Sequence, residues 1–368
     1  MHDCPFPLSE WLDKNFSMTW IDALSRLNKE NGWDTLAIGS IGPTRDERFL
    51  RGLHIKFYPE DELWNELLKH LKCKPEILLL NLMDYDSAVA RIVEVKKVSP
   101  NTKVIFRIHH EPFRLAFLQP GFIKSLRLAD LVISPLPLYN SFLNSLLNCD
   151  VVSIPFGAKD YFRPDRFLTK SKTNKAVTIS KNENPGKNIE LVKKLSEFSD
   201  EKIQFSVHID INKDEIAHRF ASSSFFFQPS LSEASGSRIL LESVHYGLIP
   251  IVFDASASCS YVAKDCGGIV VPYRISRTYL DRVSLSWSDK EAKKVMGEIE
   301  TLTGLWAGDI WSPPYFREEF EIVALMKTLV YQIDKDPQND LREVIEFILD
   351  SGNSRESREE LSEKHILQ

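Results

Sequence analysis

The 368-residue sequence has no surplus of basic residues, since 46 Lys and Arg stand against 52 Asp and Glu. Such a surplus drives binding to phosphate backbones, so no nucleic acid is expected as a partner. No run reaches the roughly 18 apolar residues of a spanning helix, and charges and prolines interrupt the apolar residues of the N-terminal MHDCPFPLSEWLDKNF. We therefore expect a cytoplasmic protein, for which peripheral membrane contact stays open.

Cysteine is scarce and scattered along the chain. The five cysteines have no C-x2-C spacing of the kind that binds zinc, and they are Cys4, Cys73, Cys149, Cys259 and Cys266. Their odd number and wide separation predict thiols in a reducing compartment. No metal site is expected.

Short apolar runs alternate with helical patterns in two series, and single hydrophobic cores stop growing at roughly 250 to 300 residues. The runs predict parallel strands at 34–38, 76–81, 103–108 and 130–134, and again at 175–180, 202–209, 224–230, 249–254 and 267–272. Segments with a 3.6-residue period separate them and predict crossover helices, for example at 60–72, 87–97, 188–198 and 213–223.

This alternation predicts an α/β fold with two Rossmann-like, doubly wound domains that face a cleft. We expect the N-terminal domain over 1–160 and the C-terminal domain over 170–311. A helix over about 312–335 is expected to pack back on the first domain, and 336–368 forms an acidic, partly disordered tail.

The segment from Pro229 to Val252 carries the strongest functional signal. A strand leads into a turn that contains Gly236, and then into a helix that begins near Ser237. The start of a helix presents free N–H groups and the positive end of its dipole, which suits a diphosphate. Gly236 lets the backbone approach such a ligand closely.

This segment resembles the donor-binding signature of the group-1 (family 4-like) glycosyltransferases, which have the GT-B fold. The matching residues, in order, are Pro229, Ser230, Glu233, Gly236, Glu242, Gly247, Pro250 and Val252. The resemblance implies that Glu233 contacts sugar hydroxyls and Glu242 the nucleotide ribose. Eight residues separate the two glutamates, one more than in the family, and the flanking matches place the extra residue in the turn. The alternative is that both are solvated surface charges.

A second match covers 180–195, where the family holds the diphosphate with basic residues. It implies this role for Lys181 and Lys187, with Ser237 and Arg238 in the first turn of the donor helix beside them. The segment FRIHHEPFR at 106–114 falls where the family carries a histidine at the cleft, which implies that His109 and His110 face the acceptor. Local hydrogen bonding is the alternative for both histidines.

The resemblance implies transfer of a sugar from a UDP- or GDP-linked nucleotide sugar to an acceptor hydroxyl, by a retaining and metal-independent enzyme. Glu233, Lys187, His109 and His110 would be catalytic, and no cofactor beyond the nucleotide-sugar co-substrate is expected. A carbohydrate or lipid-linked acceptor in polysaccharide or glycan biosynthesis would complete the reaction.

The beginning of the sequence departs from the family, because no strand with a glycine-rich loop precedes FSMTWIDALSRLNKENGW at 16–33. This departure keeps two alternatives open. The chain could be a non-catalytic binding or scaffold subunit with a glycosyltransferase-like fold. It could also be a nucleotide-sugar epimerase, which would isomerise its donor without an acceptor.

Overall fold

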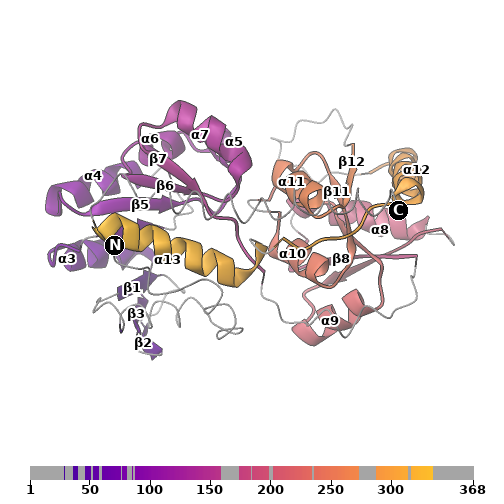
Figure 1. Ribbon diagram of the computed structural model, residues 1–368, viewed down its shortest axis with the longest axis horizontal. Coiled ribbons are helices and arrows are strands. Elements are labelled where there is room, and N and C mark those ends of the chain that lie inside the picture. Colours follow the sequence, from indigo (N-terminus) through magenta and orange to yellow (C-terminus); the bar gives the residue numbers. More distant parts are fainter. Residues whose placement is uncertain are drawn as a thin grey trace, which may run out of the picture. The chain divides into compact units, whose positions relative to one another are not determined.

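Figure 1 shows the computed structural model of the protein, which divides into two compact units, 1–154 with 319–368 and 155–318. The described residues are 29, 36–39, 46–50, 53–57, 60–75, 77–80, 85, 88–158, 174–183, 185–198, 202–233, 236–272, 287–313 and 316–334. The tail predicted at 336–368 and the segment 16–28 lie outside them. Within the described residues, no helix has both the length and the apolar character to cross a bilayer.

The first unit contains a four-stranded parallel sheet whose strands follow one another in chain order. They are β4 (Ile77–Leu80), β5 (Lys103–Arg107), β6 (Leu131–Ser134) and β7 (Asp150–Ser153). The helices around it are α3 (Glu60–Leu71), α4 (Ala88–Val98), α5 (Pro112–Leu118), α6 (Gly121–Leu126) and α7 (Asn140–Leu146), with a 3-10 turn at Pro137–Tyr139. The strands predicted at 76–81, 103–108 and 130–134 are thus confirmed.

The strand predicted at 34–38 is present and pairs in parallel, but it does not belong to this four-stranded sheet. Strand β1 (Leu36–Gly39) pairs in parallel with β3 (Leu53–Phe57), which pairs antiparallel with β2 (Asp46–Leu50). These three strands form a separate sheet. Apolar composition predicts an extended segment but does not specify the strand beside it, and that choice depends on tertiary packing.

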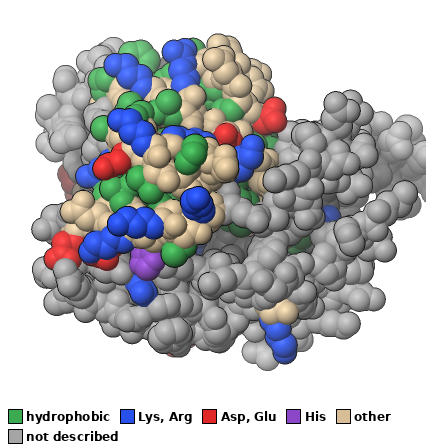
Figure 2. Space-filling model, turned by 90° about the vertical axis from the view of Figure 1, so that its left-hand side faces the viewer, with side chains coloured by type: hydrophobic (Ala, Val, Ile, Leu, Met, Phe, Trp, Pro, Cys, Tyr) green, Lys and Arg blue, Asp and Glu red, His purple; other side chains and the backbone are tan. Residues whose placement is uncertain are grey.

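Figure 2 views the molecule from the side on which α3 and α4 lie in Figure 1, where Lys and Arg side chains lie among hydrophobic ones. On α4, Ile92 and Val95 are buried, whereas Val93, Lys97 and Val98 are exposed. This helix therefore presents its apolar stripe to the core and leaves a mixed apolar and basic outer face.

Helix α13 (Glu318–Asp334), labelled in Figure 1, belongs largely to the first unit. A buried ion pair joins it to β5. The guanidinium of Arg107, the last residue of β5, donates to the carboxylate of Glu321. The two side chains are 5% and 0% exposed. A buried charge is stable only when it is paired, so this bond fixes the beginning of α13 against the end of β5.

The second unit contains a five-stranded parallel sheet in the order β12-β11-β10-β8-β9. The strands are β8 (Lys175–Ser180), β9 (Gln204–Ile209), β10 (Phe225–Gln228), β11 (Ile249–Phe253) and β12 (Ile269–Val271). The helices are α8 (Ile189–Glu197), α9 (Lys213–Ala221), α10 (Arg238–His245), α11 (Ala257–Asp265) and α12 (Asp289–Leu305). All five strands lie within their predicted segments.

Helices cover both faces of this sheet, as consecutive residues of β10 show. Phe227 packs in one core with residues of α8 and α12, whereas the ring of Phe226 meets Phe220 of α9 edge-on at 5.7 Å between centroids. Successive side chains of a strand point to opposite faces, so the apolar run of β10 needs a core on each side. The predicted doubly wound architecture is confirmed for this unit.

The buried pair predicts a large cost for removing one partner. Glu321→Ala leaves the Arg107 guanidinium buried without its carboxylate, and we expect it to lower the free energy of unfolding by about 3–5 kcal/mol. The measurement is urea denaturation.

The double variant Arg107→Met with Glu321→Leu should recover most of the lost stability, because it leaves no charge unpaired. Lys69→Ala, which removes a surface pair with Glu66, is the control and should cost under about 1 kcal/mol; an equal loss in both single variants would contradict the prediction.

Candidate functional site

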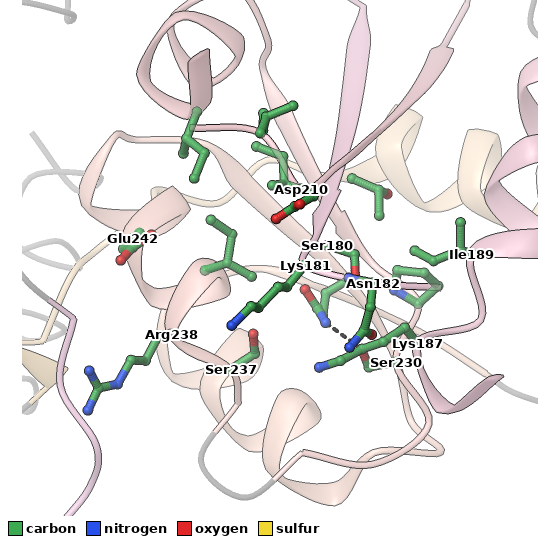
Figure 3. Close-up of a pocket in the computed structure, with 17 residues that line it drawn as sticks. Ser180, Lys181, Asn182, Lys187, Ile189, Asp210, Ser230, Ser237, Arg238 and Glu242 are labelled. Atoms are coloured by element: carbon green, nitrogen blue, oxygen red, sulfur yellow. Dashed lines mark hydrogen bonds between the residues drawn. The ribbon is translucent and has the colours of Figure 1, made fainter. Parts of the chain in front are cut away.

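A cavity of about 670 Å³ lies at the carboxyl ends of β8, β9 and β10 (Figure 3). Its lining includes Lys181 and Lys187 after β8, Asp210 after β9, and Ser230 and Ser237 after β10. Strands β8 and β10 are neighbours, yet the chain leaves β8 toward β9 and β10 toward β11, which lie on opposite sides. Ligands of open α/β sheets bind at such a point of divergence.

The loop after β8 is held in shape by hydrogen bonds that place Lys187. The Ser180 hydroxyl donates to the carbonyl of Asn182 over 2.7 Å, and a 3-10 turn follows at Pro185–Lys187. Asn188 then adopts a left-handed conformation with φ of 54°, which asparagine tolerates better than most residues. Its buried amide oxygen accepts from the indole of Trp287 over 2.7 Å. These bonds fix the backbone on both sides of Lys187.

The loops after β8 and β10 are joined by two interactions. The ammonium of Lys187 donates to the carboxylate of Glu233, and the amide of Leu231 donates to the carbonyl of Gly186 over 2.9 Å. Lys187 is 34% exposed and Glu233 only 14%. The Ser258 hydroxyl also donates to the Glu233 carbonyl. Glu233 is thus held against Lys187, which itself lines the cavity.

Helix α10 begins at the cavity after two residues with positive φ. Gly236 has φ of 83° and Ser237 of 75°. For a residue with a side chain such a conformation is strained, and strain of this kind concentrates at functional sites. Ser237 makes no side-chain capping bond to the described first turn of α10. The amides of Leu240 and Leu241 donate to the Ser237 carbonyl, so those of Arg238 and Ile239 are the ones that an anion at the cavity could meet.

The cavity lining includes a buried polar pair, Gln228 and Ser230, of which the sequence pattern had indicated only Ser230. Gln228 ends β10, and its amide nitrogen donates to the hydroxyl of Ser230. Both side chains are buried and both line the cavity. Among the described residues, the amide oxygen of Gln228 has no hydrogen-bond partner. The sequence contains a signal for Gln228, because a polar residue that ends an apolar strand lies at the ligand-binding edge of the sheet.

Five of the residues predicted from the sequence line this one cavity: Lys181, Lys187, Ser237, Arg238 and Glu242. Gly236 adjoins it and Glu233 reaches it through Lys187. Arg238 is exposed and points away from the two lysines in Figure 3. His109 and His110 follow β5 in the first unit, apart from this group in the chain. Their roles stay predictions.

The charged side chains that line the cavity are those of lysines, Arg238 and carboxylates. His208 on β9 does not add to them, because burial first and the Arg219 charge second lower its pKa. The imidazole is therefore neutral at pH 7. In the part of the chain that the structure describes, no three His, Cys, Asp or Glu side chains are grouped so that they could bind a metal ion.

Searches with the sequence match no family model and no curated protein. The structure resembles solved glycosyltransferases instead. An α,α-trehalose 6-phosphate synthase from Burkholderia multivorans matches with a TM-score of 0.54 and 9% identity over 93% of each chain. A sucrose-phosphate synthase from Thermosynechococcus elongatus matches with 0.54 and 12% identity over 85% of this chain and 92% of that one.

A third similar structure is Anabaena HepE in complex with UDP-glucose, with a TM-score of 0.52 and 10% identity over 85% of this chain and 96% of that one. The chain has the GT-B fold. The expectation of two Rossmann-like domains is thereby confirmed. At these identities the likeness shows the GT-B fold alone.

The turn before α10 predicts that Gly236 tolerates no side chain. A Cβ atom there would lie 2.5 Å from Cγ2 of the buried, β-branched Val262, and φ of 83° would be strained. Gly236→Ala should therefore lower the free energy of unfolding by about 1–3 kcal/mol. Gly297→Ala, in the interior of α12 with nothing within 4 Å, is the matched control. It should stabilise the protein by up to about 1 kcal/mol; equal thermal stability of the two variants would contradict this account.

Proposed function

We propose that the protein is a glycosyltransferase that moves a sugar from a nucleoside diphosphate to an acceptor hydroxyl. One observation carries the proposal: Lys187, the open first turn of α10 and Glu242 meet in one cavity at the divergence of β8 and β10. The GT-B fold supports it. The likeness to the group-1 signature implies a retaining mechanism.

The cavity has the chemistry that departure of a diphosphate requires. Negative charge develops on the leaving oxygen as the glycosidic bond breaks, and Lys187 with the first amides of α10 would stabilise it. These fixed cationic groups would serve without a metal ion. In this proposal Lys181 adds to the positive potential, and Arg238 would join it only after a change of side-chain rotamer.

The carboxylates suit the neutral parts of the donor. Glu242 on α10 lines the cavity and can accept hydrogen bonds from both ribose hydroxyls. Glu233 would accept from sugar hydroxyls once the phosphates have drawn Lys187 away from it. His109 and His110 are proposed for the acceptor, since they follow β5 at the carboxyl edge of the first unit's sheet.

An anionic membrane surface is proposed as the place where a lipid-linked acceptor is met. Residues 112–128 contain Arg114, Lys124 and Arg127 and no acidic residue, in a chain with a net charge of −6. Phe117 on α5 is 79% exposed, and Phe113 and Leu118 are exposed beside it in the sequence. Exposed aromatic and aliphatic side chains among cations suit the interface of an anionic bilayer. A cytoplasmic location and a role in polysaccharide biosynthesis stay predictions.

Kinetics with nucleotide sugars test the proposed donor site. Glu242→Ala should raise the donor KM by about tenfold, because ribose loses charged hydrogen bonds. Lys187→Ala should lower kcat by roughly a hundredfold, since the leaving diphosphate loses its cation. Lys193→Ala on α8 is the control, because its ammonium pairs with Glu183 at the surface and does not line the cavity.

The assay measures nucleoside diphosphate release and the sugar products, with and without acceptor sugars. Unchanged kinetics in Glu242→Ala and Lys187→Ala would remove the site assignment. Donor binding without turnover would indicate the non-catalytic subunit, and an isomerised donor formed without acceptor would indicate the epimerase. Either result would overturn the proposed glycosyltransferase activity.

Sedimentation with lipid vesicles tests whether residues 112–128 bind an anionic membrane. We expect binding to vesicles of phosphatidylglycerol with phosphatidylcholine, weakened by salt, and none to phosphatidylcholine alone. Phe117→Ser should weaken binding by about tenfold or more, because one buried aromatic side chain is lost. Leu305→Ser, at a residue 75% exposed at the end of α12, is the matched control and should change nothing. Equal weakening by both substitutions, or equal binding to both vesicles, would refute this surface.

A further inference from the structure

Asp210 directly follows β9 and lines the cavity, and the roles proposed above do not use it. Its backbone has φ of 52°, and its amide donates to the carbonyl of Ser180 over 2.9 Å. That bond ties the end of β9 to the end of β8. Figure 3 shows the Asp210 carboxylate on the cavity side of the strand. The backbone of Asp210 is therefore held at a defined place, with its carboxylate in the lining.

The negative charge of Asp210 makes the diphosphate an unsuitable ligand for it. A carboxylate repels phosphate, which belongs beside Lys187 and the first turn of α10. Glu242 already offers a carboxylate that suits the ribose. The part of a nucleotide that remains for Asp210 is the base, and the apolar side chains of Ile211 and Ile216 line the same stretch of the cavity. Apolar flanks beside a polar edge suit a flat heterocycle.

The bases differ in what they offer a carboxylate. Guanine presents two parallel donors, N1–H and the 2-amino group, which match the two acceptor oxygens as a bidentate pair. Uracil has a single N–H between two carbonyl oxygens, and these would face the carboxylate with like charge. Adenine has an amino group beside a ring acceptor. Among these bases, only guanine matches both oxygens.

We propose that Asp210 selects guanine, so that the donor is a GDP-linked sugar. This inference rests on the proposed glycosyltransferase function and names its donor. A carboxylate that loses one of its paired donors discriminates by about tenfold to a hundredfold. Asp210 is thus a specificity-determining residue in the lining of the cavity.

Isothermal titration of the full-length protein with GDP, IDP, UDP and ADP tests the proposal. IDP lacks the 2-amino group and isolates that one hydrogen bond. GDP should bind at least about tenfold more tightly than each of the other three. Asp210→Asn keeps the shape and tolerates the left-handed backbone, but its amide nitrogen opposes a guanine donor. In this variant the preference for GDP over IDP should fall to about onefold to threefold.

Asp214→Asn is the control, because Asp214 is an exposed acid in the first turn of α9 that does not line the cavity. It should keep the full preference for GDP. Tight UDP or ADP binding that Glu242→Ala abolishes would overturn the guanine assignment and leave the proposed function standing. An unchanged GDP to IDP ratio in Asp210→Asn would also overturn it. Absence of binding by all four nucleotides would overturn both proposals.

Discussion

The divergence of the chain from two neighbouring parallel strands underlies the site. Strand β8 continues through α8 to β9, and β10 continues through α10 to β11 on the other side. Because crossovers between parallel strands are right-handed, the two helices lie on opposite faces of the sheet. The loops after β8 and β10 leave the sheet edge in different directions and become walls of a cavity. The location of the cavity follows from topology before any particular side chain is considered.

The side chains that line this cavity give it one part with positive charge and another part with carboxylates. Lys187 and the start of α10 make one part suited to an anion, whereas Asp210 and Glu242 place carboxylates elsewhere on the lining. A single cavity that combines cations and carboxylates fits a ligand whose charge is confined to one segment. Nucleoside diphosphate sugars have that distribution, with a charged diphosphate between a neutral nucleoside and a neutral sugar.

The sequence predicted the second unit well because its signals are local. The strand predicted at 175–180 coincides with β8, and the helix predicted near Ser237 begins at Arg238. The choice of pairing partner is not local, and the sequence therefore did not predict that the strand at 34–38 lies in a separate sheet. Asp210 and the Lys187–Glu233 pair depend on contacts between loops that are far apart in the chain. A pattern of residue types does not carry that information.

The contact between Lys187 and Glu233 makes each side chain the resting counter-ion of the other. A free phosphate that attracted Lys187 would leave Glu233, largely shielded from solvent, without compensation for its charge. A free sugar would have to compete with an ammonium for the same carboxylate. Under the proposed function, only a ligand that carries phosphate and sugar together satisfies both groups at once. Breaking the ion pair therefore costs free energy that the intact donor compensates and a fragment of it does not. The pair thereby favours binding of the intact molecule over its fragments.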